Sequence, residues 1–199
     1  MASKDRILRL KEETRINILD AALTIAKEEG WPALSMRKIA DKIEYTAPII
    51  YEYFSNKDAI LLELTRKGFL ILAREMKAAR EKLEQPEQQL EAMWLAYWNF
   101  AFAQKELYQI MFGVEVNCCE LCAILPEAEV PSILIGELIE QLMAPHKPTE
   151  DEVCTKYYTF WSVVHGLVSI NIVRPATSDE INREVLRTTL TAIIRSLKQ

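Results

Sequence analysis

Glycine is scarce in this chain of 199 residues, and long apolar runs are missing. Five glycines are few for a turn-rich β protein, so the composition favours helices. No apolar run approaches the roughly 20 residues that a membrane helix needs. The charged start, MASKDRILRLKEETR, lacks the apolar core of a secretion signal. We therefore expect a cytoplasmic protein without membrane association, whose four cysteines stay reduced.

The chain also lacks an excess of positive charge. The formal net charge is −5, with ten basic and ten acidic residues in 1–60, and fourteen basic and nineteen acidic residues in 61–199. An acidic protein is not an obvious partner for nucleic acid, so any DNA-binding surface must be a local basic patch. Three basic residues near the N-terminus predict either an arm that enters a DNA minor groove or a disordered tail: Lys4, Arg6 and Arg9.

Apolar residues recur at helical spacing along the chain, and we find no convincing strand, so the predicted fold class is all-α. The first stripe ends at Gly30, where a helix would stop. Ser35 is a typical N-cap for a second helix, and Thr46 caps a third, short helix with a proline in its first turn. The first stripe consists of Ile16, Leu19, Ala22, Leu23 and Ala26.

A long helix follows the short one. Ser55, with Asp58 three residues later, is typical of a capping box, and the helical pattern continues to about Leu83. Further on, Thr149 with Glu152 and Thr177 with Glu180 predict the starts of the last two helices. We divide the chain into a DNA-binding domain over 1–60, a connector helix over 61–85 and a helical domain over 86–199.

The second and third predicted helices are separated by a break of a few residues, which is the pattern of a helix-turn-helix motif. In that motif the second helix lies in the major groove of DNA. Ile50 and Phe54 fall on one side of the short helix, where they would pack on the first two helices. Tyr51 falls on the opposite side, which can face DNA.

The stretch LSMRKIADKIEYTAPIIYEYFSNKDAIL resembles the helix-turn-helix of the TetR family of bacterial repressors. The family pattern is a capped helix T-x-R-x-I-A, a turn, a recognition helix ending Tyr-x-Tyr/His-Phe, and then x-x-K-x-x-L. Further on, ELYQIMFG and WSVVHGL resemble a TetR-family C-terminal domain marked by Trp-x-x-x-His-Gly. The matching positions of the first motif are Ser35, Arg37, Ile39, Ala40, Tyr51, Tyr53, Phe54, Lys57 and Ile60.

The resemblance implies an N-terminal three-helix DNA-binding domain and a C-terminal domain that senses a ligand and dimerises. It also implies a ligand-responsive repressor that binds a double-stranded DNA operator. The sequence departs from the family at two positions. Glu44 stands where the turn usually has glycine, so either Glu44 adopts a glycine-like conformation or the turn differs slightly. Ala47 stands where lysine or glutamine is frequent, which leaves few polar groups for base edges.

Candidate DNA contacts follow from the motif. The resemblance places the Tyr51 hydroxyl on a phosphate, and Lys57 would meet a phosphate together with the free N–H groups of the long helix. Arg37 can either contact a guanine or pair with Asp41 one turn on. Ser35 and Thr46 would both cap helices and donate to phosphates, whereas three apolar residues would contact thymine methyl groups. The expected DNA-binding residues are Ser35, Arg37, Thr46, Ala47, Pro48, Ile49, Tyr51 and Lys57.

The C-terminal part is rich in aromatic side chains, and the family resemblance places a ligand cavity among its helices. An apolar cavity with a few polar groups suits a small hydrophobic effector. The alternative is a packed aromatic core, in which His165 would bond to a backbone carbonyl. The expected ligand-binding residues are Trp94, Trp98, Tyr108, Met111, Trp161 and His165.

Small residues recur on the helix that carries His165, and small residues let helices approach closely. Together with the apolar last helix they predict a four-helix interface of a homodimer, although close packing within one subunit would give the same pattern. Obligate dimerisation fits a helix-turn-helix protein that reads two half-sites. The expected interface residues are Ser162, Gly166, Ser169, Leu190 and Ile194.

Parts of the sequence suggest three other functions. Cys119 and Cys122, with Cys118 beside them, form a single C-x-x-C that could sense metal or thiol oxidation, but no second pair is present. An all-helical enzyme is disfavoured because the chain has two histidines, no glycine-rich phosphate loop and no paired-carboxylate motif. A helical interaction module that has lost DNA binding is the third alternative. We expect no cofactor and no metal.

Overall fold

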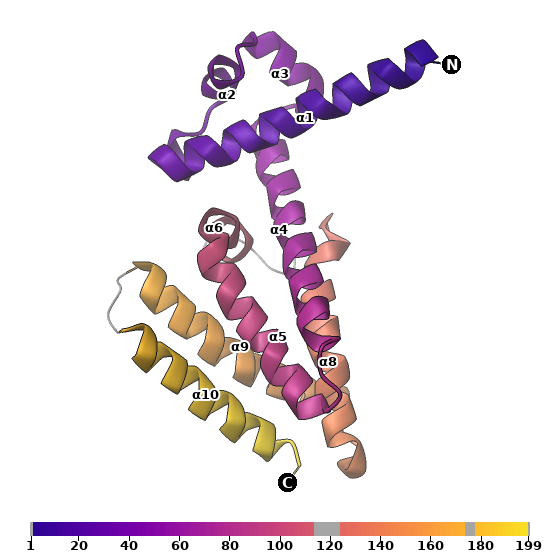
Figure 1. Cartoon of the computed structure of the whole chain (residues 1–199), viewed down its shortest axis with the longest axis vertical. Coiled ribbons are helices and arrows are strands. Elements are labelled where there is room, and N and C mark those ends of the chain that lie inside the picture. The colour runs from indigo at the N-terminus through magenta and orange to yellow at the C-terminus, as the bar shows by residue number, and fades with distance from the viewer. Residues whose placement is uncertain (1, 114–123, 174–177, 199) are drawn as a thin grey trace. The chain divides into compact units, whose positions relative to one another are not determined.

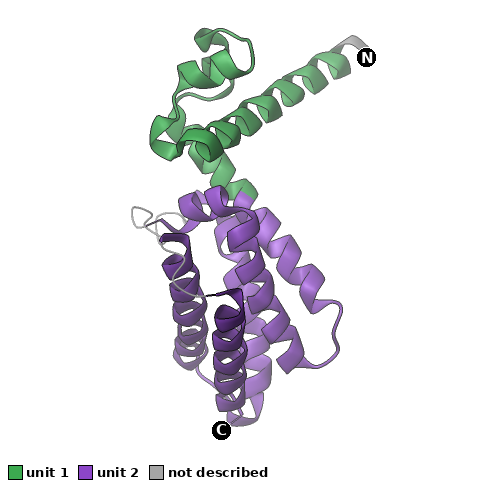
Figure 2. Cartoon of the chain, turned by 60° about the vertical axis from the view of Figure 1, so that its left-hand side comes forward, with its two compact units in different colours: residues 1–67 green, residues 68–199 purple. Residues whose placement is uncertain are grey.

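The computed structural model describes residues 2–113, 124–173 and 178–198, and these residues form helices, turns and connecting segments without a strand. The chain divides into two compact units, residues 1–67 and 68–199 (Figure 2). Within the described ranges no helix combines the length and apolar character that crossing a membrane requires. The all-α prediction is confirmed.

Unit 1 is built on its first helix (Figure 1). It contains α1 (Ala2–Glu29), η1 (Trp31–Ala33), α2 (Met36–Lys42), α3 (Ala47–Tyr53) and the start of α4 (Lys57–Arg80). Its core collects side chains from all four α-helices, because each presents an apolar side to the same centre. The fully buried members are Ile18 and Ala22 of α1, Ile39 of α2, Ile50 of α3, and Ile60 and Leu64 of α4.

The structure corrects two predictions about α1. The helix begins at Ala2, so Lys4, Arg6 and Arg9 lie in a helix, not in an arm or disordered tail. Ile16 was expected in the core but is 46% exposed. The other members of the predicted stripe lie where expected, since Leu19, Ala22 and Ala26 are buried beside Ile18 and Ile25 and Leu23 is half-buried.

The starts of α2, α3 and α4 were predicted to within a residue. The Ser35 hydroxyl accepts from the backbone N–H of Lys38 at 3.2 Å, as expected of an N-cap. Thr46 occupies the N-cap position of α3, but its side chain makes no capping bond. The predicted capping box at Ser55 is wrong. The adjacent Asn56 caps α4, because its carboxamide oxygen lies 2.8 Å from the N–H of Ala59.

Unit 2 surrounds α5 (Pro86–Ala103), which packs against α6 (Lys105–Phe112), α8 (Val130–Met143), α9 (Glu150–Val173) and α10 (Asp179–Ser196). The remainder of α4 and two short turns, η2 (Pro126–Ala128) and η3 (Ala144–His146), complete it. Figures 1 and 2 show α9 and α10 running side by side. The largest fully buried side chains of this unit are Trp94, Phe100 and Phe160.

The last two helices, α9 and α10, both begin at polar side chains that cap them. Thr149 and Glu152 form the predicted capping box, with the Thr149 N–H donating to the Glu152 carboxylate at 2.8 Å. Ser178, rather than Thr177, caps α10 by accepting from the N–H of Ile181 at 3.3 Å, and Thr177 lies outside the described residues.

Candidate functional sites

The outer side of α3 is the first candidate site. Ile50 and Phe54 are buried at 0% and 4% exposure, whereas Tyr51 between them is 54% exposed. The helix therefore presents Tyr51 to solvent, as its spacing predicts. All eight residues expected at DNA are exposed or half-buried, so each has a side chain accessible from outside unit 1.

The turn before α3 adopts the conformation that its sequence makes unusual. Glu44 has φ of 60°, in the left-handed region that favours glycine. The first of the two expectations for this turn is therefore confirmed. The backbone still closes the turn, since the Tyr45 N–H donates to the Ala40 carbonyl at 2.9 Å.

Ion pairs fix α2 on α1. Lys38 pairs with Glu29 at 2.5 Å and Lys42 pairs with Glu28 at 2.8 Å. Arg37 lies on the same helix and is exposed, and among the described residues it has no ion pair, including none with Asp41. Of the two interpretations of Arg37, the geometry leaves the guanidinium available for an external partner.

A second set of contacts fixes the end of α3 and the start of α4. The Arg15 guanidinium lies 5.2 Å from the centre of the Phe54 ring and pairs with Glu63 at 3.1 Å. Hydrogen bonding from Arg66 is the main cause that lowers the pKa of the Glu63 carboxyl, with Arg15 adding to it against the effect of burial. Lys67 pairs with Asp20 at 3.2 Å. The beginning of α4 is thus held on α1.

The N-terminus of α4 offers free backbone donors. Asn56 satisfies the N–H of Ala59, while the N–H groups of Lys57 and Asp58 are the first two of the helix and have no acceptor within it. Lys57 is half-buried beside them. An ammonium group next to helix N–H groups is an arrangement that binds phosphate.

The second candidate site is an apolar cavity of about 160 Å³ inside unit 2. Its wall comes from α4, α5, α6, η2, α8 and α9, and none of the described wall residues carries a charge. The lining consists of Phe69, Trp94, Tyr97, Met111, Phe112, Ala128, Pro131, Ser132, Ile135, Tyr157, Tyr158 and Trp161.

A chain of hydrogen bonds begins at this wall. Trp161 Nε1 donates to the Tyr97 hydroxyl at 3.2 Å, and the Tyr97 and Tyr108 hydroxyls lie 3.0 Å apart. The Tyr108 hydroxyl is 2.5 Å from His165 Nδ1, and His165 Nε2 is 3.4 Å from the Ser169 hydroxyl. The prediction that a buried His165 would bond to a backbone carbonyl is wrong, because its partners are side chains.

Burial sets the protonation states of the side chains in this series of hydrogen bonds. It raises the pKa of Tyr97 well above the usual range, with the neighbouring Tyr108 as the next cause, and it raises the pKa of Tyr108. Burial lowers the pKa of His165. At neutral pH the two phenols are therefore protonated and the imidazole is neutral. We assign Tyr108 as donor to Nδ1, which places the imidazole proton on Nε2, facing Ser169.

Three of the six predicted ligand residues line the cavity: Trp94, Met111 and Trp161. Tyr108 and His165 do not line it but bond to the wall residue Tyr97. Trp98 belongs to neither group, since it lies on another side of α5 against Phe102, with ring centres 4.7 Å apart. Placing Trp98 at the ligand site is thus not supported by the geometry.

The prediction of the site missed Phe69 and Tyr97. Phe69 lies on α4 and is buried, as are Leu72 and Met76 on the same helix, so its spacing alone does not distinguish a cavity wall from a packed core. Tyr97 lies one turn after Trp94 on α5, and that spacing could have placed it on the same wall.

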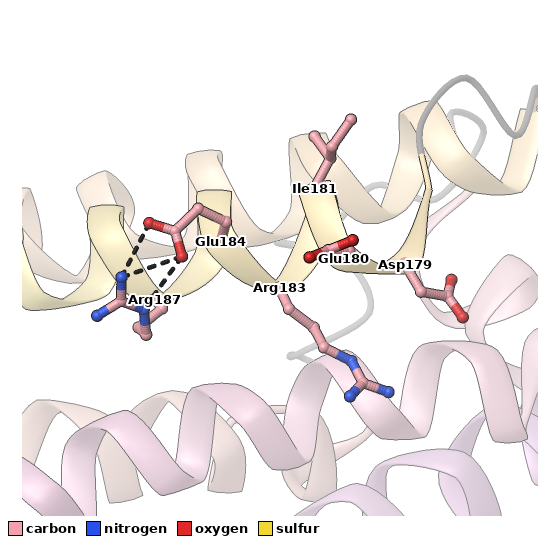
Figure 3. A pocket seen from close by; sticks show the side chains of 6 residues that line it. All are labelled: Asp179, Glu180, Ile181, Arg183, Glu184 and Arg187. Carbon is pink, nitrogen blue, oxygen red and sulfur yellow. Dashed lines mark hydrogen bonds and ion pairs between the residues drawn. The ribbon is translucent and has the colours of Figure 1, made fainter.

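A further hollow of about 830 Å³ lies along the outside of α10. Its lining residues all come from one stretch of that helix, so it is a surface groove and not an enclosed site. Figure 3 shows Glu184 paired with Arg187, while Ile181 and Arg183 point to different sides. The lining residues are Asp179, Glu180, Ile181, Arg183, Glu184 and Arg187.

The predicted dimer residues separate into two groups. Leu190 and Ile194 are buried within the single chain, at 0% and 7% exposure, so their inclusion in an interface between subunits is corrected. Ser162 is exposed, whereas Gly166 and Ser169 are half-buried, and a Cβ placed on Gly166 would meet no atom within 4 Å.

The cysteine hypothesis falls outside the part of the chain that can be described. Cys118, Cys119 and Cys122 lie in residues 114–123, which the structure does not describe, and Cys154 is exposed on α9. Within the described ranges, no group of three or more histidine, cysteine or acidic residues could hold a metal ion.

A helix-turn-helix with an exposed second helix, joined to an all-helical unit, defines a DNA-binding transcriptional regulator. Residues 18–64 match the model of the bacterial regulatory proteins of the tetR family. Residues 90–193, about half of the chain, match a tetracyclin repressor-like C-terminal domain. The chain belongs to the TetR family of transcriptional regulators, which are not enzymes.

Characterised relatives carry related names. The chain is 25% identical over 177 residues to the HTH-type transcriptional repressor KstR of Rhodococcus jostii, covering 87% of this chain and 80% of KstR. It is 27% identical over 143 residues to KstR of Mycobacterium tuberculosis, covering 71% of this chain and 64% of that protein. The matched region thus spans less than two thirds of the M. tuberculosis repressor.

Solved structures share the fold. A protein of unknown function from Rhodococcus sp. RHA1 aligns with a TM-score of 0.78 and 20% identity, covering 93% of this chain and 95% of the other. FadR of Thermus thermophilus, a repressor in complex with lauroyl-CoA, aligns with a TM-score of 0.62 and 17% identity, covering 90% and 93%. At these identities the likeness concerns the fold alone.

Proposed function

We propose that the chain is a homodimeric repressor that leaves a palindromic operator when a small hydrophobic compound fills the cavity of unit 2. One observation carries this proposal: Phe69, which lines the cavity, lies on the same helix as Lys57, the expected phosphate contact. Of the helices described, α4 alone belongs to both units. The proposed direction of regulation, repression, follows the names of the KstR relatives.

Contacts inside unit 2 support a path from the cavity to α4. The Phe69 and Phe112 rings meet edge to face with centres 5.6 Å apart. Gly68 allows Met111 to approach closely, because a Cβ at Gly68 would lie 2.4 Å from Met111 Sδ. Phe69, Met111 and Phe112 all line the cavity. A ligand that displaces these side chains acts on α4, and we propose that α4 then tilts and changes the spacing of the two recognition helices.

The DNA contacts in this proposal are those of unit 1. Tyr51 and Lys57 would bind phosphates, together with the hydroxyls of Ser35 and Thr46. Arg37 would reach a base edge, and Ala47, Pro48 and Ile49 would contact thymine methyl groups. The exposure of these residues supports the assignment, and so does the absence of an ion pair at Arg37 among the described residues.

An apolar surface on α9 and α10 supports the homodimer. Ile170 and Val173 are 55% and 85% exposed on α9, and Ile181 and Val185 are 52% and 38% exposed on α10. We propose that this surface, with Ser162, Gly166 and Ser169, meets the same surface of a second copy. A two-fold dimer places two recognition helices at half-sites about one turn of DNA apart or a multiple of it.

A titration of the effector with and without DNA tests the proposal. The operator is sought by fluorescence anisotropy on DNA from upstream of the protein's own gene, and binding compounds are found by thermal shift. A coupling of about 1–3 kcal/mol would release DNA about 5- to 150-fold, and operator DNA must weaken ligand binding by the same factor. Equal ligand affinity in the two titrations contradicts the induction mechanism for that compound.

A further inference from the structure

One polar atom of the cavity wall has no partner among the described residues. Trp94 lines the cavity and is fully buried, and its indole Nε1 makes no hydrogen bond to any of them. It is the one buried side-chain nitrogen or oxygen in this state among the described residues. An unsatisfied buried donor destabilises the empty site, so a ligand acceptor that reaches it would bind more tightly.

The other donors in the hydrogen-bonded series at the cavity wall already have acceptors within the protein. Trp161 Nε1 donates to Tyr97, and the Tyr97 and Tyr108 hydroxyls bond to each other and to His165. Ser132 donates to the Glu129 carbonyl at 2.8 Å. Among the fully buried side-chain polar atoms of the described wall, the unmet requirement is therefore a single donor, which calls for a single acceptor.

Size and charge narrow the ligand further. An engineered apolar cavity of about 150 Å³ is large enough for benzene, and this one measures about 160 Å³. Among the residues that the structure describes, no cationic side chain lines it, so a buried carboxylate would be left without a counter-ion at high cost. Six of the wall residues are aromatic rings of the α5, α6 and α9 helices, which suit a flat apolar partner: Trp94, Tyr97, Phe112, Tyr157, Tyr158 and Trp161.

We propose that the cavity selects an uncharged, ring-sized apolar compound with one hydrogen-bond acceptor, which accepts from Trp94 Nε1. This inference rests on the proposed function, because it specifies the chemical class of the effector that the regulator senses. It distinguishes the site from one built for a free carboxylic acid or for the charged part of a larger conjugate.

Three probes of nearly equal shape test the proposal: acetophenone, α-methylstyrene and benzoate. α-Methylstyrene replaces the carbonyl oxygen of acetophenone by a methylene group, and benzoate replaces the methyl ketone by a carboxylate. Dissociation constants are measured by calorimetry on the full chain without DNA. We expect acetophenone to bind at least about tenfold more tightly than benzoate, since the carboxylate has no partner in the wall.

The Trp94 bond is isolated by a comparison that cancels differences in hydrophobicity. The preference for acetophenone over α-methylstyrene should fall about fivefold in Trp94→Phe, which lacks the donor, and should be unchanged in Trp98→Phe. Trp98 is the matched control because it does not line the cavity. The wild-type protein gives a second measurement that needs no variant. Its assigned Trp94 indole N–H resonance should move downfield with acetophenone and not with α-methylstyrene.

The proposal is overturned if benzoate binds as tightly as acetophenone, if the preference is the same in Trp94→Phe and wild type, or if none of the probes binds at millimolar concentration. Failure of the proposed function looks different. In that case acetophenone binds with the expected selectivity but leaves operator affinity unchanged. Conversely, if a compound releases DNA and its binding does not depend on Trp94, the proposed function stands and the proposed ligand class is rejected.

Discussion

The Tyr108 hydroxyl and His165 Nδ1 lie 2.5 Å apart and join α6 to α9 across 57 residues of sequence. The imidazole must be neutral at Nδ1 to accept this bond. Burial, which lowers the pKa of His165, favours the same neutral form. The polar groups that face His165 are Tyr97, Tyr108 and Ser169, all of them uncharged at neutral pH.

The lowered pKa of His165 predicts a pH dependence of stability. Its contribution is fully present above the unfolded value of 6.5 and is lost as pH falls below it, because the unfolded chain binds the proton more readily. The melting temperature of wild type should therefore drop between pH 7.5 and pH 5.5 by more than that of His165→Gln. His146→Gln is the control, since His146 is exposed. The same pH dependence in all three proteins would contradict the prediction.

Lys57→Ala should weaken binding to operator and to unrelated DNA alike. Loss of one phosphate contact lowers the slope of log affinity against log salt by about 0.9 per subunit, because fewer counterions are released. Lys82→Ala, at an exposed lysine of unit 2, should leave the slope unchanged. An unaltered slope in Lys57→Ala would remove Lys57 from the DNA surface.

Tyr51→Phe isolates the phenolic hydroxyl. The hydroxyl makes no hydrogen bond among the described residues, so thermal stability should stay the same. DNA affinity should fall at least about tenfold, because hydrogen bonds to charged groups contribute roughly 1.5–3 kcal/mol. Tyr158→Phe provides a control at equal exposure, since both side chains are 54% exposed. Anisotropy titrations that cannot distinguish the two variants would refute the phosphate contact.

Gly166→Leu should produce monomers that remain folded. A Cβ at position 166 meets no atom within 4 Å among the described residues, so we expect the single chain to accommodate the larger side chain, which would project into the proposed dimer surface. Gly136→Leu is a matched control, because Gly136 also has open space around its Cβ position, on α8. Sedimentation velocity should give a dimer for wild type and Gly136→Leu. A dimer of undiminished strength for Gly166→Leu would exclude Gly166 from the interface.

Gly68→Ala should lower the stability of the protein and displace Met111, a side chain of the cavity wall. The added methyl group would lie 2.4 Å from Met111 Sδ and 3.2 Å from Met111 Cγ, so the buried Met111 must move. Overpacking of this kind costs about 1–3 kcal/mol of the free energy of unfolding. Adding Met111→Ala removes both clashing atoms, and the two substitutions should then cost less together than their sum. Additive effects in urea denaturation would show that no clash occurs.

Local signals in the sequence predicted most of the helices. Ser35, Thr149 and Glu152 are found at the caps where side-chain chemistry places them. Ser55 and Asn56 illustrate the limit, because both are good capping residues and lie side by side. Only the geometry of the first turn shows that Asn56 accepts the bond. A sequence pattern therefore located this helix start but could not select between adjacent residues.

Apolar spacing alone did not separate a core from an interface. Leu190 and Ile194 follow one face of α10, and that pattern is the same whether the face meets its own chain or another. Their burial inside unit 2 depends on α5 and α9, which only the tertiary structure brings to them. The position of Phe69 in the cavity wall was not predicted for the same reason, because its neighbours there come from distant segments of the chain.

In unit 1, the residues that maintain the fold and those that face outward belong to separate sets. The ion pairs Lys38–Glu29, Lys42–Glu28 and Arg15–Glu63 hold the helices together. Arg37, Pro48 and Tyr51 are exposed, and in the part of the chain that is described their side chains make no hydrogen bond or ion pair. Mutations at these outward positions can accumulate without loss of folding, so a duplicated copy of the gene could diverge toward a new operator while inheriting an intact scaffold.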